Sequence, residues 1–316
     1  LVGIPSSVPR FHQGPLTVWL QMIIYLVFGQ RTLAYSIVFA LISLMAVIGL
    51  YELVTIQLGS RVGLVAATLL ALSPLAIAQG RMPYHTNPIP LALIIFLASQ
   101  LYLWQRRKWG LFVAFLGWAL IMQFELSLFA LGLVIPYVMW RRKIKLKWTQ
   151  LSQLSAGFLI GFLPQIIQDL TQPITQNQIG GFTAWVGYRL LSWLGFLNDA
   201  HQISGYKLSQ ALSHFLKHGS RIFSPGYQLS FWLVLLIIVL AMVKVWLHKI
   251  KLPALVELTS LATVILSLSY LVHSAPSTAY FPPYLVLLPI LVAYSLKVLL
   301  KKHTGFLLPL LLLSYS

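Results

Sequence analysis

The sequence contains no cysteine and very little acid: five Asp and Glu residues stand against 22 Lys and Arg residues in 316 positions. The absence of cysteine excludes a disulfide framework, a thiolate metal site and a thiol nucleophile. Charged residues make up only 9% of the chain, whereas hydrophobic residues make up 59%. A soluble fold needs more polar surface than this to cover its core, so the composition favours a lipid bilayer as the solvent.

Long apolar segments are what the chain has in abundance, and each spanning helix needs roughly 20 mostly apolar residues. We expect no internal repeat and no low-complexity tract. The apolar segments fall at about 32–58, 62–78, 88–104, 109–140, 152–169, 229–247, 254–272, 281–299 and from 305 onward. We therefore predict an all-α fold, a polytopic transmembrane bundle of about nine or ten helices.

The net charge of +17 is distributed in short basic runs between the apolar segments. Such runs are typical of topology signals, so we predict no nucleic-acid partner. The segment 109–140 has a basic run on each side, at 106–108 and at 141–143. Because basic flanks favour the cytoplasm, both ends should be cytoplasmic. This predicts a hairpin of two short helices that turns near 123–125, rather than one long tilted helix.

The same rule applied to the whole chain places 15 of the 22 Lys and Arg residues on the cytoplasmic side. The extracytoplasmic side then collects residues 1–14, 79–87, about 170–228 and 273–280. In the long loop, Leu208, Leu212, Phe215 and Leu216 share one helical face, which predicts a helix lying in the membrane interface. We expect a multi-pass cell-membrane protein whose extracytoplasmic face carries the chemistry.

Five stretches carry a family resemblance: GIPSSVPRFHQGPL (3–16), LVFGQR (26–31), LGSRVGLVAATLLALSPLAIAQGR (58–81), MPYHTNPIP (82–90) and HSAPSTAYFPPYLVLLP (273–289). Together they resemble the polyprenyl-phosphate-sugar glycosyltransferases of the GT-C fold. Within these, the chain is similar to the protein-mannosyltransferase-like and aminoarabinose-transferase-like group, glycosyltransferase families 39 and 83. One departure is Ala279, which stands where a basic residue is common in that group.

The resemblance implies a single GT-C-like transmembrane domain over 1–316, with the first helix and the C-terminal part missing and with 170–228 as an extracytoplasmic loop carrying interfacial helices. It implies inverting transfer of a hexosyl or pentosyl group from a polyprenyl-phosphate-linked donor to a protein, lipid or glycan. We predict no cofactor besides that donor substrate, and no metal site, because His12 and His85 are far apart in the sequence. The family's catalytic base is an acid in the first outer loop. No Asp or Glu precedes Glu52, so the base is expected outside this chain, with Asp169 and Asp199 as fallback candidates.

Candidate substrate-binding residues lie in the predicted outer parts of the chain and near the hairpin turn. A leaving phosphate needs cationic help, which Arg side chains give through charge-assisted hydrogen bonds. An acid at the turn lies below the outer edge of a ~30 Å core, because helices of about 14 residues reach only roughly 20 Å. The candidates are Arg10, His12, Arg81, His85, Glu125 and Tyr280.

Each candidate also has a structural interpretation. Arg81 can be an interfacial anchor that reaches to lipid headgroups. His12 and His85 can be simple polar contacts, and Tyr280 can belong to an aromatic belt. Glu125 can be a structural carboxylate hydrogen-bonded to Gln123 within the hairpin.

Two other classes of function compete with the glycosyltransferase hypothesis. A secondary transporter or lipid flippase also uses many helices and a few buried polar groups, but transporters are commonly built from repeated halves. A non-catalytic membrane scaffold needs no acidic base.

Overall fold

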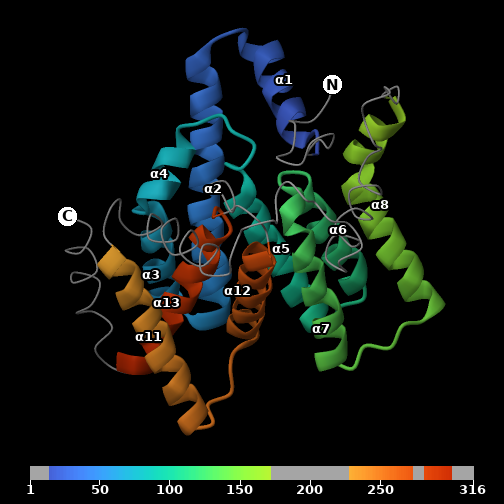
Figure 1. Cartoon of the computed structure of the whole chain (residues 1–316). Coiled ribbons are helices and arrows are strands. Elements are labelled where there is room, and N and C mark those ends of the chain that lie inside the picture. The colour runs from blue at the N-terminus through green and yellow to red at the C-terminus, as the bar shows by residue number, and fades with distance from the viewer. Residues whose placement is uncertain (1–13, 172–227, 273–280, 301–316) are drawn as a thin grey trace.

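The computed structural model describes residues 14–171, 228–272 and 281–300, and every regular element in these ranges is a helix (Figure 1). The predicted all-α bundle is therefore confirmed. The predicted interfacial helix near 208–216 and the apolar run from 305 lie outside the described residues. The elements are α1 (Leu16–Phe28), α2 (Thr32–Leu58), α3 (Ser60–Ala71), α4 (Pro74–Gly80), α5 (Ile89–Trp104), α6 (Gly110–Met122), the 3-10 helix η1 (Leu126–Leu133), α7 (Val134–Arg141), α8 (Trp148–Thr171), α11 (Gln228–Leu247), α12 (Ala254–Val272) and α13 (Tyr284–Leu300).

Within the described residues, two helices are by themselves long and apolar enough to cross a bilayer, namely α2 and α8. The bent pair α3 and α4 makes a third if it is one broken span, and the remaining apolar helices have 10–17 described residues. The expected number of nine or ten crossings stays a prediction.

The segment predicted as one apolar stretch over 62–78 is instead broken between α3 and α4, whose axes differ by 63°. The break has a local cause at Ser73 and Pro74. Proline has no N–H to donate to the preceding turn, so it is favoured at the first position of a new helix. The Ser73 Oγ accepts a hydrogen bond from the Ala76 N–H at 3.4 Å and caps α4. The Ser-Pro pair therefore ends one helix and starts the next.

The hairpin predicted within 109–140 is confirmed. Helix α6 ends at Met122, and η1 begins at Leu126 after a three-residue turn. The Trp118 Nε1–H donates to the Phe129 carbonyl at 3.1 Å and ties the two arms together. Away from the turn, the end of α7 is joined to the end of α5, because the Arg142 Nε–H donates to the Trp104 carbonyl at 2.9 Å. The two basic flanks thus lie at the same end of the bundle.

Helix α8 packs closely along α6 because two small residues on α8, Gly157 and Gly161, face it. A Cβ atom at Gly157 would overlap the main chain of Phe112, and one at Gly161 would lie 2.7 Å from the Ala119 Cβ. Small residues four apart let two helices approach at the backbone, a common arrangement in membranes. This contact fixes α6, and through α6 the turn that follows it.

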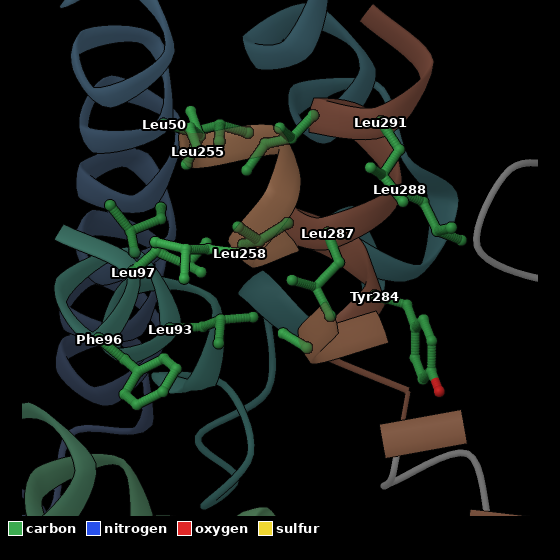
Figure 2. Packing of buried hydrophobic residues seen from close by; sticks show 14 of the residues in the cluster. Leu50, Leu93, Phe96, Leu97, Leu255, Leu258, Tyr284, Leu287, Leu288 and Leu291 are labelled. Carbon is green, nitrogen blue, oxygen red and sulfur yellow. The ribbon is translucent and has the colours of Figure 1, made fainter. Parts of the chain in front are cut away.

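The core lies where α2, α5, α12 and α13 meet, and Figure 2 shows leucine side chains from all four helices pointing toward one another. Helix α13 is the most enclosed element, because every residue from Tyr284 to Leu296 is buried. Tyr284 belongs to this core: its hydroxyl lies 2.9 Å from the Ser267 Oγ. Its side chain is therefore part of the packed interior.

The bundle has two chemically different ends. We call the end that carries the α5–α6, α7–α8 and α11–α12 connections the basic end; the last two connections are at the bottom of Figure 1. Here the Lys297 Nζ donates to the Leu58 carbonyl at 2.8 Å, and the Lys244 Nζ donates to the Val298 carbonyl at 2.9 Å. We call the other end, with residues 81–88 and the turn 123–125, the polar end.

A short sequence repeat, Lys-Ile-Lys-Leu at 143–146 and 249–252, is found at the basic end, where the sequence analysis expected no repeat. Each copy ends a helix in the same way, with a lysine at positive φ: 51° at Lys143 and 50° at Lys249. The following isoleucine donates its N–H to a carbonyl five residues back, from Ile144 to Met139 and from Ile250 to Val245, both at 2.9 Å. This is the Schellman cap, with lysine where glycine is usual.

Candidate functional site

The polar end is built around the turn between α6 and η1, which is buried although it is polar. Gln123 is 0% exposed and Glu125 is 6% exposed. Gly14, just before α1, lies directly on the turn: a Cβ there would come within 2.5 Å of the Gln123 Cα. The Gly-Pro-Leu motif thus brings the start of α1 against the α6–η1 turn, because only glycine fits so close to another backbone.

The Glu125 carboxylate faces the α4–α5 loop. Its Oε2 lies 3.5 Å from the Nε2 of His85, and both side chains are less than a tenth exposed. Its Oε1 accepts a hydrogen bond from the Ser127 N–H at 3.3 Å, which caps η1. Two candidates that are forty residues apart in the sequence are therefore brought together in one buried pair.

The hypothesis that Gln123 holds Glu125 within the hairpin is wrong. Neither the Nε2 nor the Oε1 of Gln123 has a hydrogen-bond partner, although both atoms are buried. The partner of Glu125 comes from a different loop because the hairpin turn points its carboxylate across to α4–α5 rather than back along the turn. Glu257, at the basic end, pairs with Arg141 at 2.9 Å and accepts a hydrogen bond from the Tyr137 hydroxyl.

Tyr84 lies beside this pair, with its ring centroid 4.1 Å from that of His85. Partial burial raises the pKa of the Tyr84 hydroxyl above its ordinary value, and the negative charge of Glu125 raises it further. The hydroxyl therefore keeps its proton at neutral pH and is available as a hydrogen-bond donor.

Asn87 holds the loop in place. Its Nδ2 donates to the Gln79 carbonyl at 2.6 Å and to the Met82 carbonyl at 3.3 Å, and its Oδ1 accepts from the Ser43 hydroxyl on α2 at 3.4 Å. The Gln21 side chain of α1 adds a hydrogen bond to the Pro83 carbonyl at 2.9 Å. The position of His85 is therefore fixed from three helices.

Arg81 stands at the end of α4, exposed, at the edge of a cavity of about 310 Å³. The cavity runs between α2, α3 and α4 and is mostly apolar, with Arg81, Asn87, Gln79 and Ser43 as its polar lining residues. The Oε1 of Gln79 is buried without a hydrogen-bond partner. An apolar cavity with a cation at its edge suits a ligand that has a hydrocarbon chain and an anionic head.

The remaining candidates cannot be placed. Arg10, His12, Asp199 and Tyr280 lie outside the described residues, and Asp169 lies in α8 with a side chain that is likewise outside the description. The structure thus brings His85 and Glu125 together. Arg81 lies in the same α4–α5 region, four residues before His85 in the sequence. Within the described part of the chain, no group of three His, Asp or Glu side chains could hold a metal ion.

Sequence reasoning missed several buried polar residues at this end or in the helices that lead to it. They are Thr17, Asn87, Gln165 and Gln168, all less than 4% exposed. Two signals were available. Asn87 lies in the proline-rich run NPIP, where a side chain must supply hydrogen bonds that proline cannot, and Gln165 and Gln168 are three apart in an apolar helix, directly after Pro164.

The sequence of residues 12–167, about half of the chain, matches the family described as dolichyl-phosphate-mannose-protein mannosyltransferase. The solved structure of ArnT from Cupriavidus metallidurans bound to undecaprenyl phosphate superposes with a TM-score of 0.64 over 94% of this chain. The chain is similar to the GT-C glycosyltransferases in both sequence and fold. No curated protein sequence matches it.

The likeness to ArnT has two limits that matter for function. The sequences are 13% identical, so this GT-C likeness establishes the fold alone. The chain also spans about half of ArnT, covering 52% of that protein. The match to the mannosyltransferase family covers α1 to α7 and most of α8, so it includes the hairpin turn, His85 and Arg81.

Proposed function

We propose that this chain belongs to a membrane glycosyltransferase that takes a sugar from a polyprenyl-phosphate-linked donor at the polar end. The observation that carries the proposal is the buried His85–Glu125 pair, which lies within the family-matched region and at the end opposite the basic turns. An ionisable pair at membrane depth is costly unless it faces protein or a water-filled cavity, and such pairs mark substrate sites. The family match and the fold likeness support the lipid-linked donor.

The polar end faces the extracytoplasmic side in this proposal. The support is the distribution of charge: Arg106, Arg142, Lys244 and Lys297 gather by direct contacts at the basic end. Lys and Arg in short loops favour the cytoplasm. A lipid-borne sugar would then be presented from the outer leaflet.

In the proposed arrangement, the donor's hydrocarbon chain lies in the cavity between α2, α3 and α4, and its phosphate meets Arg81. As the acceptor oxygen bonds to the anomeric carbon, the bond from that carbon to the phosphate oxygen breaks, and the guanidinium stabilises the leaving phosphate. Glu125, oriented by His85, hydrogen-bonds hydroxyl groups of the sugar or acceptor. The base that takes the acceptor's proton stays with the candidates Asp169 and Asp199 or with an acid outside this chain.

The proposal is tested with the protein in proteoliposomes that contain a radiolabelled polyprenyl-phosphate mannose. Release of polyprenyl phosphate is measured, because this product forms whether the acceptor is protein, lipid, glycan or water. Glu125→Gln and Arg81→Ala should each lower the rate, whereas Glu52→Gln should not, since Glu52 is exposed on α2 away from the pair. Equal rates in all three variants would overturn the site assignment.

The alternative of a transporter or flippase predicts a different result in the same vesicles. Lipid-linked sugar would move between leaflets without loss of the sugar–phosphate bond. Intact donor on both sides and no polyprenyl phosphate would reject the glycosyltransferase proposal, and a scaffold would give neither movement nor cleavage.

A further inference from the structure

A cavity of about 270 Å³ opens at the basic end, between the α5–α6 and α7–α8 connections. It is separate from the His85–Glu125 site, which lies at the other end of the bundle. Six cationic side chains line it, together with Leu103, Gly110, Leu111, Ile144, Gln150 and Gln153. The six are Arg106, Arg107, Lys108, Lys143, Lys145 and Lys147.

No carboxylate lines this cavity. Glu257 lines the neighbouring cavity, where it is engaged by Arg141 and Tyr137. The ammonium groups of Lys108, Lys145 and Lys147 make no hydrogen bond or ion pair in the described part of the chain. The six positive charges therefore surround the cavity without a carboxylate among the described residues that line it.

The backbone holds the cations in this arrangement. Arg106 and Lys143 both have positive φ, 57° and 51°, which is uncommon for residues other than glycine. The Arg106 guanidinium donates to the Arg142 carbonyl, and the Arg142 Nε–H donates to the Trp104 carbonyl, so the ends of α5 and α7 are locked together. A topology signal needs positive charge alone, whereas this cavity also has fixed walls. Fixed walls are what a bound ligand requires.

Exposed apolar side chains flank the same connections. Each connection passes into the next helix through a Lys-Trp pair, Lys108-Trp109 and Lys147-Trp148. Trp109 is 51% exposed and Trp148 is 86% exposed. Tryptophan at this kind of position sits at the headgroup level of a bilayer. The cavity therefore lies where lipid phosphates are found.

We propose that this cavity binds the phosphate headgroup of an anionic phospholipid from the adjoining leaflet. The chemistry is charge-assisted hydrogen bonding of phosphate oxygens by Arg and Lys, with the acyl chains lying against the exposed tryptophans. Basic pockets between transmembrane helices are suited to lipids with more than one phosphate or with a net negative charge. The assignment stands independently of the proposed glycosyl transfer.

The test is native mass spectrometry of the protein in neutral detergent, titrated with cardiolipin and, separately, with phosphatidylcholine. The test variant is Lys108→Gln/Lys145→Gln/Lys147→Gln, which leaves both positive-φ residues and the interhelical arginine contacts intact. The matched control is Arg61→Gln/Lys249→Gln/Lys251→Gln, which removes the same charge from residues that do not line the cavity. Cardiolipin affinity should fall by roughly five-fold per cavity cation removed, so about 100-fold in the test variant, and by less than about three-fold in the control.

Equal losses in the two variants would overturn the proposal, because the charge would then act only as a diffuse field. Displacement of cardiolipin by pyrophosphate at millimolar concentration would also overturn it, since the ligand would then be a soluble phosphate. If the triple variant does not fold, the single variant Lys145→Gln, which alters one exposed side chain, should still lose about five-fold. Unchanged glycosyl transfer in the test variant leaves the proposed function standing, so the two proposals fail separately.

Discussion

The basic end and the polar end of this bundle differ in where their polar side chains lie and in what holds those side chains in place. At the basic end, lysine and arginine side chains are exposed, and the backbone fixes them through helix caps at Lys143 and Lys249. At the polar end, Glu125 and His85 are buried, and other side chains fix them. Exposed charge costs little and can be repeated, whereas each buried polar group needs its own partner.

This difference predicts how sensitive each end is to substitution. The polar end should lose function or stability when a single contact is removed, because each contact there is made once. The basic end should tolerate single changes, because several cations share the same role. Four substitutions test that contrast.

The largest effect should come from Gly157→Leu, which disrupts the packing of α8 against α6 that supports the polar end. The side chain would collide with the Phe112 main chain and separate α8 from α6. We expect a loss of about 3 kcal/mol in the free energy of unfolding, the upper part of the range for overpacked sites. Unfolding in SDS measures it. The control is Gly29→Leu, because nothing lies within 4 Å of a Cβ there, although its φ of 69° adds a strain cost of about 1 kcal/mol. Equal losses would show that helix separation is not the cause.

Glu125→Gln should lower donor cleavage by about 100-fold, which corresponds to roughly 2.7 kcal/mol in the activation free energy. The amide keeps the size of the side chain and still caps Ser127, but it removes the negative charge that faces His85. Initial rates at saturating donor measure the effect. A rate within two-fold of wild type would place the chemistry elsewhere. It would also show that activity does not depend on this single contact at the polar end.

Asn87→Ala should cost about 2 kcal/mol of unfolding free energy. The change removes the hydrogen bonds that the Asn87 side chain makes with the Gln79 and Met82 carbonyls and with the Ser43 hydroxyl. Thermal unfolding followed by tryptophan fluorescence measures it. Asn87→Asp is the matched comparison, since it keeps the acceptor and loses the donor; a variant as stable as wild type would contradict the hydrogen bonds described here.

Lys143→Gly at the basic end should have the smallest effect and the opposite sign. Glycine adopts positive φ without steric cost, so the substitution should stabilise the protein by about 1 kcal/mol. Lys145→Gly, at a residue without positive φ, should destabilise slightly instead. The difference in melting temperature between the two variants measures the backbone strain at the cap.

The sequence was sufficient for the elements that depend on local pattern. The bounds of α2 match the predicted segment 32–58, and the turn near 123–125 followed from the charges on both sides of the hairpin. Apolar runs and basic flanks are properties of neighbouring residues, so they can be recognised without a structure. The break between α3 and α4 was equally local, since Ser73-Pro74 marks it, but hydropathy alone does not resolve it.

The pairing of His85 with Glu125 could not be predicted in the same way. The two residues are forty positions apart, and their contact depends on how α4–α5 lies over the hairpin turn. The sequence named both as candidates, yet it assigned Glu125 a neighbour, Gln123, that the structure shows to be unpaired. Partners at short separation are the natural first guess, and tertiary packing decides otherwise.

The shortness of α6 has an electrical consequence. With 13 residues it is about 20 Å long, so in a ~30 Å hydrocarbon core its turn ends well inside the membrane rather than at the far surface. A charge that moves between this turn and the outer surface therefore crosses part of the transmembrane potential, which is worth about 2.3 kcal/mol per charge for a full crossing at 100 mV. Any step that changes charge at this pair should run at a rate that depends on membrane voltage, whereas the exposed cations of the basic end lie outside that field.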